Sequence, residues 1–252
     1  MKRFISTRSG YYLLGVFLLL TVWFIASYVI DEQSLILPNP LVTIKETIVM
    51  LGKEFTYKCM GSSLFKLVIG FAISLVLSLI FGIIAGNSKA FQAILSPFMS
   101  SMKSIPTAAL VFLFLVIAGS SYTPIIMVVL ISLPILYESI VGGIENMDQD
   151  VIKAMKLEST SRLRSVLFIE IPLMLPYLFV GIASSFSLSF KIEIMSEILT
   201  GDTRLGLGSA ILGFQKTDPT NMIPIFAYSL IVIIISLIFN AIFNFVKKKY
   251  SI

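Results

Sequence analysis

The side chains in this sequence that are best suited to chemistry are three ionisable residues within an otherwise apolar stretch, residues 172–199. Lys191 and Glu193 are two positions apart and point to different faces of a helix, whereas Glu193 and Glu197 are four apart and share one face. A charge inside a membrane-spanning helix is costly unless it is paired or faces water, so these side chains are candidates for function. The candidate lining of a solute path is Ser187, Phe190, Lys191, Glu193 and Glu197.

Three interpretations of these charges stay open. They could line a path for a solute, or they could form a charge pair that holds subunits together. They could also lie near the outer end of a tilted helix, from which long side chains reach the membrane interface. A further charge in an apolar stretch, Glu138, is expected at the inner interface or in a pair with a loop lysine.

The residues that the sequence lacks exclude most catalytic chemistry. It contains no histidine and a single cysteine, Cys59, so neither a metal cluster nor an internal disulfide is expected. No Gly-x-x-x-x-Gly-Lys-Ser/Thr motif occurs, so the chain is not expected to hydrolyse ATP through a P-loop. No nucleophile–base pair and no cofactor site are expected, which disfavours a membrane enzyme.

The composition is typical of an integral membrane protein. Of the 252 residues, 57% are hydrophobic and 13% are charged, and the mean hydropathy is +0.96. Soluble domains carry roughly 25% charged residues, about twice as many. The net charge of +5 comes from lysines and arginines in short loops and tails, so nucleic-acid binding is not expected and the lipid bilayer is the expected surrounding.

Apolar stretches long enough to cross a bilayer predict an all-α integral membrane fold, with residues 1–252 forming one polytopic domain. A polar interruption, residues 142–171, separates the fourth stretch from the fifth. Turns are expected at Gly119–Thr123 and Leu205–Gly208, and an amphipathic interfacial helix is expected after an N-cap at Asn39. The six predicted transmembrane helices are about 11–30, 67–86, 104–118, 124–141, 172–199 and 222–246.

The distribution of basic residues predicts the orientation of these helices. Six crossings place both termini and the interruption at 142–171 on the same side of the membrane. That side carries 12 lysines and arginines, and the other side carries 5. Because basic residues concentrate in cytoplasmic loops, both termini and the interruption are predicted to be cytoplasmic, in a multi-pass protein of the cell (inner) membrane.

The polar interruption has the pattern of two short helices lying on a membrane surface. Asp148 or Asp150 is a suitable N-cap for the first helix, and Ser159–Ser161 breaks it. A second helix is predicted from Arg162 to about Ile171. A helix–break–helix element of this kind is typical of a docking element rather than of a pore.

This interruption also carries a family resemblance. Lys153-Ala154-Met155, three further residues and Ser159-Thr160-Ser161, followed by RSVLFIEIPLMLPYLFVGI, resemble the signature loop of ABC-importer permeases. That loop holds Glu-Ala-Ala, then a glycine and later Leu-Pro; here Lys153 replaces the glutamate and Ser159 replaces the glycine. The resemblance covers nearly the whole chain and is greatest to the nitrate, sulfonate and taurine branch. It extends through Leu37–Pro40, Ile105-Pro106, Ala109-Leu110 and Leu205–Gly208.

The resemblance implies that the chain is one subunit of a larger transport complex. A coupling helix at residues 150–157 would seat in a groove of a separate ATPase, and closure of two ATP-binding cassette subunits would move it as a lever. A second permease copy, as in a homodimer, would complete the path, and an extracytoplasmic substrate-binding protein would deliver a small solute such as a sulfonate, nitrate, taurine or a thiamine precursor. The resemblance assigns ATPase coupling to Val151, Lys153, Ala154, Met155, Leu157, Ser159, Thr160 and Ser161.

One alternative from a different class stays open. A self-contained, ion-coupled carrier or channel could use Lys191 and Glu197 as its ion site. Carriers often contain inverted repeats. No convincing repeat relates residues 11–118 to residues 124–246, so the importer interpretation is favoured.

Overall fold

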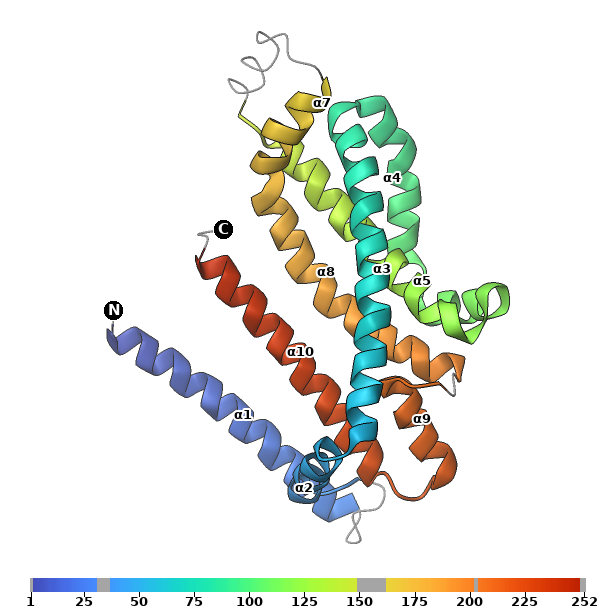
Figure 1. The fold of residues 1–252 in the computed structure, drawn as a ribbon. Helices are drawn as coiled ribbons and strands as arrows, with labels where there is room; N and C mark the ends of the chain where they lie inside the picture. Colours follow the sequence, from blue (N-terminus) through green and yellow to red (C-terminus); the bar gives the residue numbers. More distant parts are fainter. Residues whose placement is uncertain (1, 31–36, 149–161, 202–203, 250–252) are drawn as a thin grey trace.

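The computed structural model describes residues 2–30, 37–148, 162–201 and 204–249, and the regular structure in these ranges is entirely helical (Figure 1). Four helices in this part of the chain are long and apolar enough to cross a membrane: Glu54–Asn87, Thr107–Glu145, Val166–Thr200 and Ile223–Val246. The helices in order are α1 (Lys2–Ile30), α2 (Pro40–Leu51), α3 (Glu54–Asn87), α4 (Lys89–Ser104), α5 (Thr107–Glu145), α7 (Arg162–Ser165), the π-helix η1 (Val166–Glu170), α8 (Ile171–Thr200), α9 (Leu207–Thr217) and α10 (Ile223–Lys249).

The long helices alternate in direction between two ends of the molecule. We call the end where α5 stops and α7 begins the α7 end, and the opposite end, which carries α2 and α9, the α9 end. In Figure 1, α1, α4 and α8 run toward the α9 end, whereas α3, the longer part of α5 and α10 run toward the α7 end. The first residue of α1 and the last residue of α10 therefore both face the α7 end.

Local sequence signals explain where several of these helices begin and end. Asn39 caps α2 as predicted, because its side chain accepts a hydrogen bond from the backbone N–H of Leu41, and Pro40 takes the first helical position. Two apolar side chains of α2 face outward, Leu41 at 68% and Ile48 at 66% exposed, while Thr43 is buried. An apolar outer face is what an interfacial helix needs.

Gly119 divides α5 into two helical parts. Its backbone adopts φ 77° and ψ 170°, whereas the residues on either side are helical. Glycine adopts a positive φ at no steric cost, so the chain reverses here without a longer loop. The turn predicted at Gly119–Thr123 is thus confirmed in place but confined to Gly119. The predicted third span, 104–118, corresponds to the end of α4, the break at Ile105-Pro106 and the short first part of α5.

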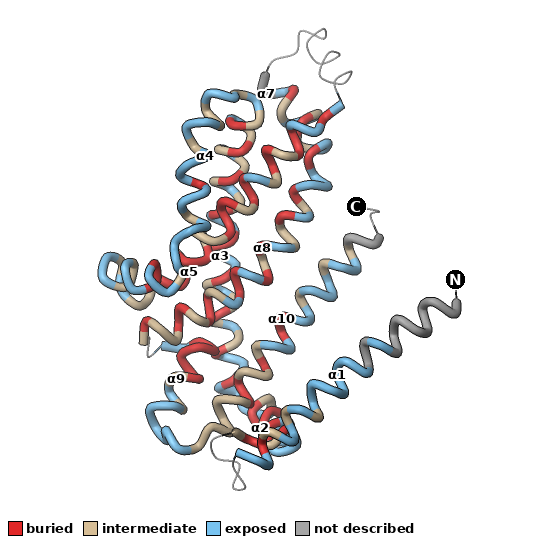
Figure 2. The backbone as a smooth tube through the Cα atoms, turned by 180° about the vertical axis from the view of Figure 1, so that it is seen from behind, coloured by how far each residue is buried: buried red, intermediate tan, exposed pale blue. Residues whose placement is uncertain are grey.

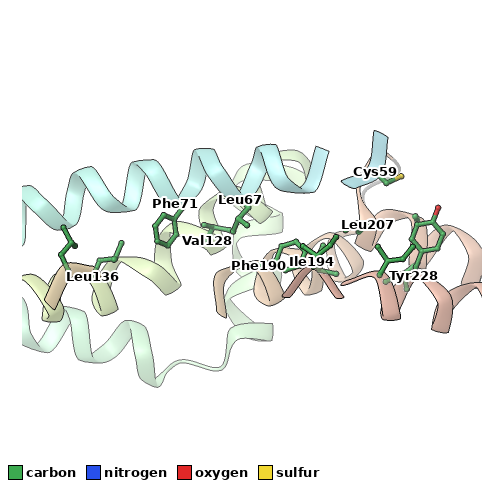
Figure 3. Close-up of a cluster of buried hydrophobic side chains, with 14 of the residues drawn as sticks. Cys59, Leu67, Phe71, Val128, Leu136, Phe190, Ile194, Leu207 and Tyr228 are labelled. Atoms are coloured by element: carbon green, nitrogen blue, oxygen red, sulfur yellow. The ribbon is translucent and has the colours of Figure 1, made fainter. Parts of the chain in front are cut away.

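The core of the bundle is a closely packed seam between α3, α5 and α8. Gly70, Gly82 and Gly86 of α3 lie against Val128, Ile140 and Ile144 of α5, so closely that a Cβ atom on any of these glycines would fall within 2.9 Å of a partner side chain. Small residues permit such helix contact in membranes, where packing rather than hydrophobicity holds helices together. Figure 3 shows the buried cluster along this seam, from Leu136 near one end to Tyr228 of α10 near the other.

The buried surface is concentrated in α3, α5 and α8, whereas α1 lies apart (Figure 2). α1 meets the rest of the protein near its last turns, where the Trp23 indole donates a hydrogen bond to the carbonyl of Pro38 (3.1 Å) and lies 6.2 Å from the ring of Phe226. Most of its described side chains are exposed, including Val29 at 76%.

The fifth predicted span is longer than expected. The predicted helix from Arg162 to about Ile171 is helical in the structure, but it continues through η1 directly into α8. Of the turn predicted at Leu205–Gly208, Leu205 and Gly206 lie outside helical structure, whereas Leu207 already begins α9, a helix that was not predicted. The predicted coupling helix at 150–157 and the break at Ser159–Ser161 lie outside the described residues.

Candidate functional site

The three ionisable residues of α8 separate into two faces of the helix. Glu193 and Glu197 are fully buried, with 0% of their surface exposed, and they point into the bundle. Lys191 is exposed on the other face. Spacing accounts for this arrangement, because residues four apart share a helix face and residues two apart do not.

Glu197 is the centre of a buried polar network, which we call the Glu197 network: Glu197, Lys66, Ser63 and the backbone N–H groups of Leu207 and Gly208. The Lys66 amine lies 2.6 Å from Oε1 of Glu197, and the Ser63 hydroxyl lies 3.0 Å from Oε2. The backbone N–H of Gly208 donates to Oε2 (2.8 Å), and that of Leu207 donates to the Ser63 oxygen (2.9 Å). The network therefore joins α3, α8 and α9.

The electrostatics of this network favour an ionised pair. The Glu197 carboxylate sits at the first turn of α9, where unpaired backbone N–H groups and the helix dipole favour a negative charge. The Lys66 side chain is only 11% exposed and turns inward to Glu197. Removing one partner of a buried ion pair is strongly destabilising.

The glycines before and within α9 make this approach possible. A Cβ atom at Gly206 would overlap the carboxylate oxygens of Glu197, and one at Gly208 would lie 2.7 Å from the Cβ atom of Glu197. Gly213, five residues after Gly208 on α9, has no neighbour within 4 Å of such an atom. The two glycines of the Leu205–Gly208 motif are therefore needed for close packing against α8.

Glu193 lies one helical turn from Glu197 but outside this network. Neither of its carboxyl oxygens has a hydrogen-bond partner among the described residues, and the hydroxyls of Ser189 and Ser196 on the same helix also lack one there. The buried face of α8 thus carries more polar atoms than the described neighbours satisfy.

The remaining path candidates also face the interior. Ser187 is buried and donates a hydrogen bond to Oδ1 of Asn240 on α10 (2.9 Å), and Phe190 is fully buried edge-on against Phe239 (5.5 Å). The structure therefore does not bring the five candidates together on one surface. Four face the bundle interior, and Lys191 is the one that faces outward.

A second group of polar contacts lies toward the α7 end, and two of them were not predicted from the sequence. Glu170, the last residue of η1, is 2% exposed and accepts a hydrogen bond from Nδ2 of Asn87 at the end of α3 (2.7 Å). Gln92 of α4 donates to Glu145 at the end of α5 (3.1 Å). Glu138 forms an ion pair with a lysine, Lys103, as expected.

The predicted ATPase-coupling residues cannot be placed in these clusters, because they lie outside the described residues. The chain leaves the described region at Asp148 and re-enters it at Arg162, next to the clusters at the α7 end (Figure 1). The residues concerned are Val151, Lys153, Ala154, Met155, Leu157, Ser159, Thr160 and Ser161.

Comparison with known proteins assigns the family. Residues 78–252 match the family described as the inner membrane component of binding-protein-dependent transport systems. The chain belongs to this family. It is therefore a permease, the transmembrane component of an ABC importer, and the prediction from the signature loop is confirmed at this level.

Relatives of the permease come from the branch that the sequence resembles. It is 27% identical to the nitrate import permease protein NrtB of Synechocystis sp., over 76% of this chain and 72% of the relative. It is 22% identical to the putative aliphatic sulfonates transport permease protein SsuC of Bacillus subtilis, over 81% and 74%. The taurine transport system permease protein TauC of Escherichia coli is 21% identical, over 79% and 75%.

The fold of the permease is also shared with a solved structure. A crystal structure of an amino acid ABC transporter with histidines superposes with a TM-score of 0.63 at 13% identity, covering 83% of this chain and 97% of the other. The carrier alternative gains no support from the site, because Lys191 and Glu197 lie on different faces of α8 and Glu197 is paired with Lys66.

Proposed function

We propose that two copies of this permease form a solute path that is opened by two separate ATPase subunits acting on residues 149–161 of each copy. The observation that carries this proposal is the packing of the helices on either side of that segment. α5 ends shortly before the segment, η1 and α8 follow it, and α5 and α8 pack against each other along much of their length. A displacement of the segment would therefore act on both helices together.

Close contacts support the transmission of movement between α5 and α8. A Cβ atom at Gly143 of α5 would lie 2.9 Å from the Cβ atom of Met174 on α8, and one at Gly181 of α8 would overlap the hydroxyl of Ser139 on α5. Such interfaces have little free space, so a shift of one helix is passed to its neighbour rather than absorbed.

The alternation of helix direction supports six crossings with both termini in the cytoplasm. With six crossings, α4 and the first part of α5 together make the third crossing, and the part of α5 after Gly119 makes the fourth. The excess of basic residues on the side of the termini favours a cytoplasmic α7 end and an external α9 end. ATPase subunits would then dock at the α7 end, and a substrate-binding protein would deliver solute at the α9 end.

The relatives guide the choice of solute. They are permeases for nitrate, aliphatic sulfonates and taurine, all of them small polar solutes. We propose that this permease imports a small solute of the same kind.

Docking of an ATPase is the step to test first. The permease is purified with candidate ATPase subunits, and co-elution and ATP hydrolysis are compared between wild type, Ala154→Glu and Met155→Glu. A charge on the apolar face of the predicted coupling helix should release the ATPase. Ser251→Glu, which adds the same charge to the C-terminal tail, is the matched control.

Release by both coupling variants but not by Ser251→Glu supports the proposal, provided that all variants elute as folded protein. The proposal is wrong if wild type recruits an ATPase that Ala154→Glu and Met155→Glu bind equally well.

A further inference from the structure

Lys191 is a cation exposed on the surface of α8, within a helix that is long and apolar enough to cross a membrane. It lies nine residues before the end of α8 at Thr200, about 14 Å along the helix axis. It forms no hydrogen bond or ion pair with a described residue, whereas Glu197 on the opposite face is paired with Lys66. A lysine facing hydrocarbon at such a depth is unfavourable, so this face of α8 requires water or a partner.

The face that carries Lys191 has further polar groups along its length. Tyr177, Ser184 and Lys191 are spaced seven residues apart, and all three are exposed. Residues seven apart on an α-helix lie nearly above one another, so these side chains form a line about 21 Å long. A lipid-facing stripe has no need of such groups, whereas the wall of a water-filled path does.

The charge balance along this line is positive. The carboxylates of the same helix, Glu193 and Glu197, are turned into the bundle, and no described acidic side chain pairs with Lys191. An uncompensated cation beside a narrow aqueous path between low-dielectric walls raises the local concentration of anions and repels cations.

We propose that Lys191 is a specificity-determining residue of the path and that the imported solute is a small anion. This inference rests on the proposed function, because it takes the line of Tyr177, Ser184 and Lys191 to face the path between two copies. Lys191 would attract the anion through its charge, and Ser184 lies about 10 Å away along the path, within reach of the same field.

The test measures the electrostatic field at Ser184 with charged thiol reagents. The full-length permease, carrying Cys59→Ser so that no native thiol remains, is reconstituted in phosphatidylcholine liposomes with the added change Ser184→Cys. Its reaction rates with the anionic sulfonatoethyl and the cationic trimethylammonioethyl methanethiosulfonates are each divided by the rate with free cysteine. Leu237→Cys on α10, which is 61% exposed, is the lipid-facing control.

We expect the thiol at 184 to react much faster than the thiol at 237 and to favour the anionic reagent by about two- to tenfold, the range for a unit charge about 10 Å away. Lys191→Gln should abolish this preference, and Lys191→Arg should keep it. If the thiol at 184 reacts no faster than the thiol at 237, the face is not a path and the proposed arrangement fails.

Two other outcomes overturn the anion inference alone. A thiol at 184 that reacts from water without charge preference, or with a preference that survives Lys191→Gln, leaves the path in place but removes the role of Lys191. A preference that is lost when phosphatidylglycerol is added to the liposomes assigns Lys191 to a lipid phosphate instead of to a solute.

Discussion

The two ends of α8 are held in different ways. At the α9 end, Glu197 binds a lysine and a serine of α3 and the first turn of α9, and glycines allow the helices to approach closely. At the α7 end, α8 is preceded by the π-helix η1, and Glu170 binds the amide of Asn87. Ion pairs in a buried network resist displacement, whereas π-helical turns are rare and occur often at functional sites. The comparison indicates that α8 is anchored at the α9 end and adaptable at the α7 end.

A substitution in the Glu197 network is expected to have the largest effect on stability. Glu197→Ala should lower the free energy of unfolding by about 3–5 kcal/mol, because it breaks a buried ion pair by removing the carboxylate that Lys66 contacts. The measurement is unfolding in detergent micelles, followed by circular dichroism.

Glu54→Ala is the matched control for Glu197→Ala. It breaks the exposed pair with Lys58 one turn away on α3, and such pairs contribute about 0.3–0.5 kcal/mol. Equal effects of the two substitutions would mean that the Glu197 network does not anchor the helix.

Substitutions of the glycines of α9 test the close packing around the Glu197 network without changing a charge. Gly208→Ala should destabilise the protein by about 1–3 kcal/mol, because the added methyl group meets the Cβ atom of Glu197. Gly213→Ala on the same helix meets nothing and should stabilise by up to about 1 kcal/mol through helix propensity. Opposite signs for the two variants in the same unfolding assay confirm the close approach, and a stabilising Gly208→Ala contradicts it.

The bond between Asn87 and Glu170 tests the other end. Asn87→Ala should cost about 1.5–3 kcal/mol, the usual contribution of a hydrogen bond to a carboxylate, and should increase amide hydrogen exchange in η1 more than in the last turns of α8. A cost as large as that of Glu197→Ala, or exchange that rises equally at both ends, would remove the contrast between the two ends.

Glu138→Gln is expected to have the smallest effect. Its partner Lys103 is 39% exposed and Glu138 itself is 53% exposed, so the loss of this pair should change the free energy of unfolding by less than about 1 kcal/mol. The same unfolding assay measures it. A larger cost would show that charge pairs near the α7 end are as important for stability as the Glu197 network.

Sequence patterns predicted the features that depend on neighbours along the chain. The separation of Lys191 from Glu193 and the N-cap at Asn39 follow from helical period and capping chemistry, and the structure confirms both. The family resemblance added the importer function through a loop whose own structure lies outside the described residues.

The missed features depend on residues that are distant in sequence. Lys66 and Glu197 are separated by 131 positions, and nothing local to either shows that they meet. Glu170 and Asn87 are 83 positions apart, and an acidic residue beside a predicted membrane surface is ordinarily solvated. A signal for the first pair was present nonetheless, because two opposite charges near the same end of two predicted spans are best satisfied by each other.

The peripheral position of α1 has a consequence for biosynthesis. A helix whose contacts are concentrated near Trp23 and Ser27, with most of its described side chains turned outward, depends on lipid more than on protein for its stability. During synthesis it can therefore settle in the bilayer before α3, α5 and α8 have emerged, and it need not wait for a docking surface. Assembly of α3, α5 and α8 and insertion of α1 are then separate events, and the contact near Trp23 at the α9 end joins their products.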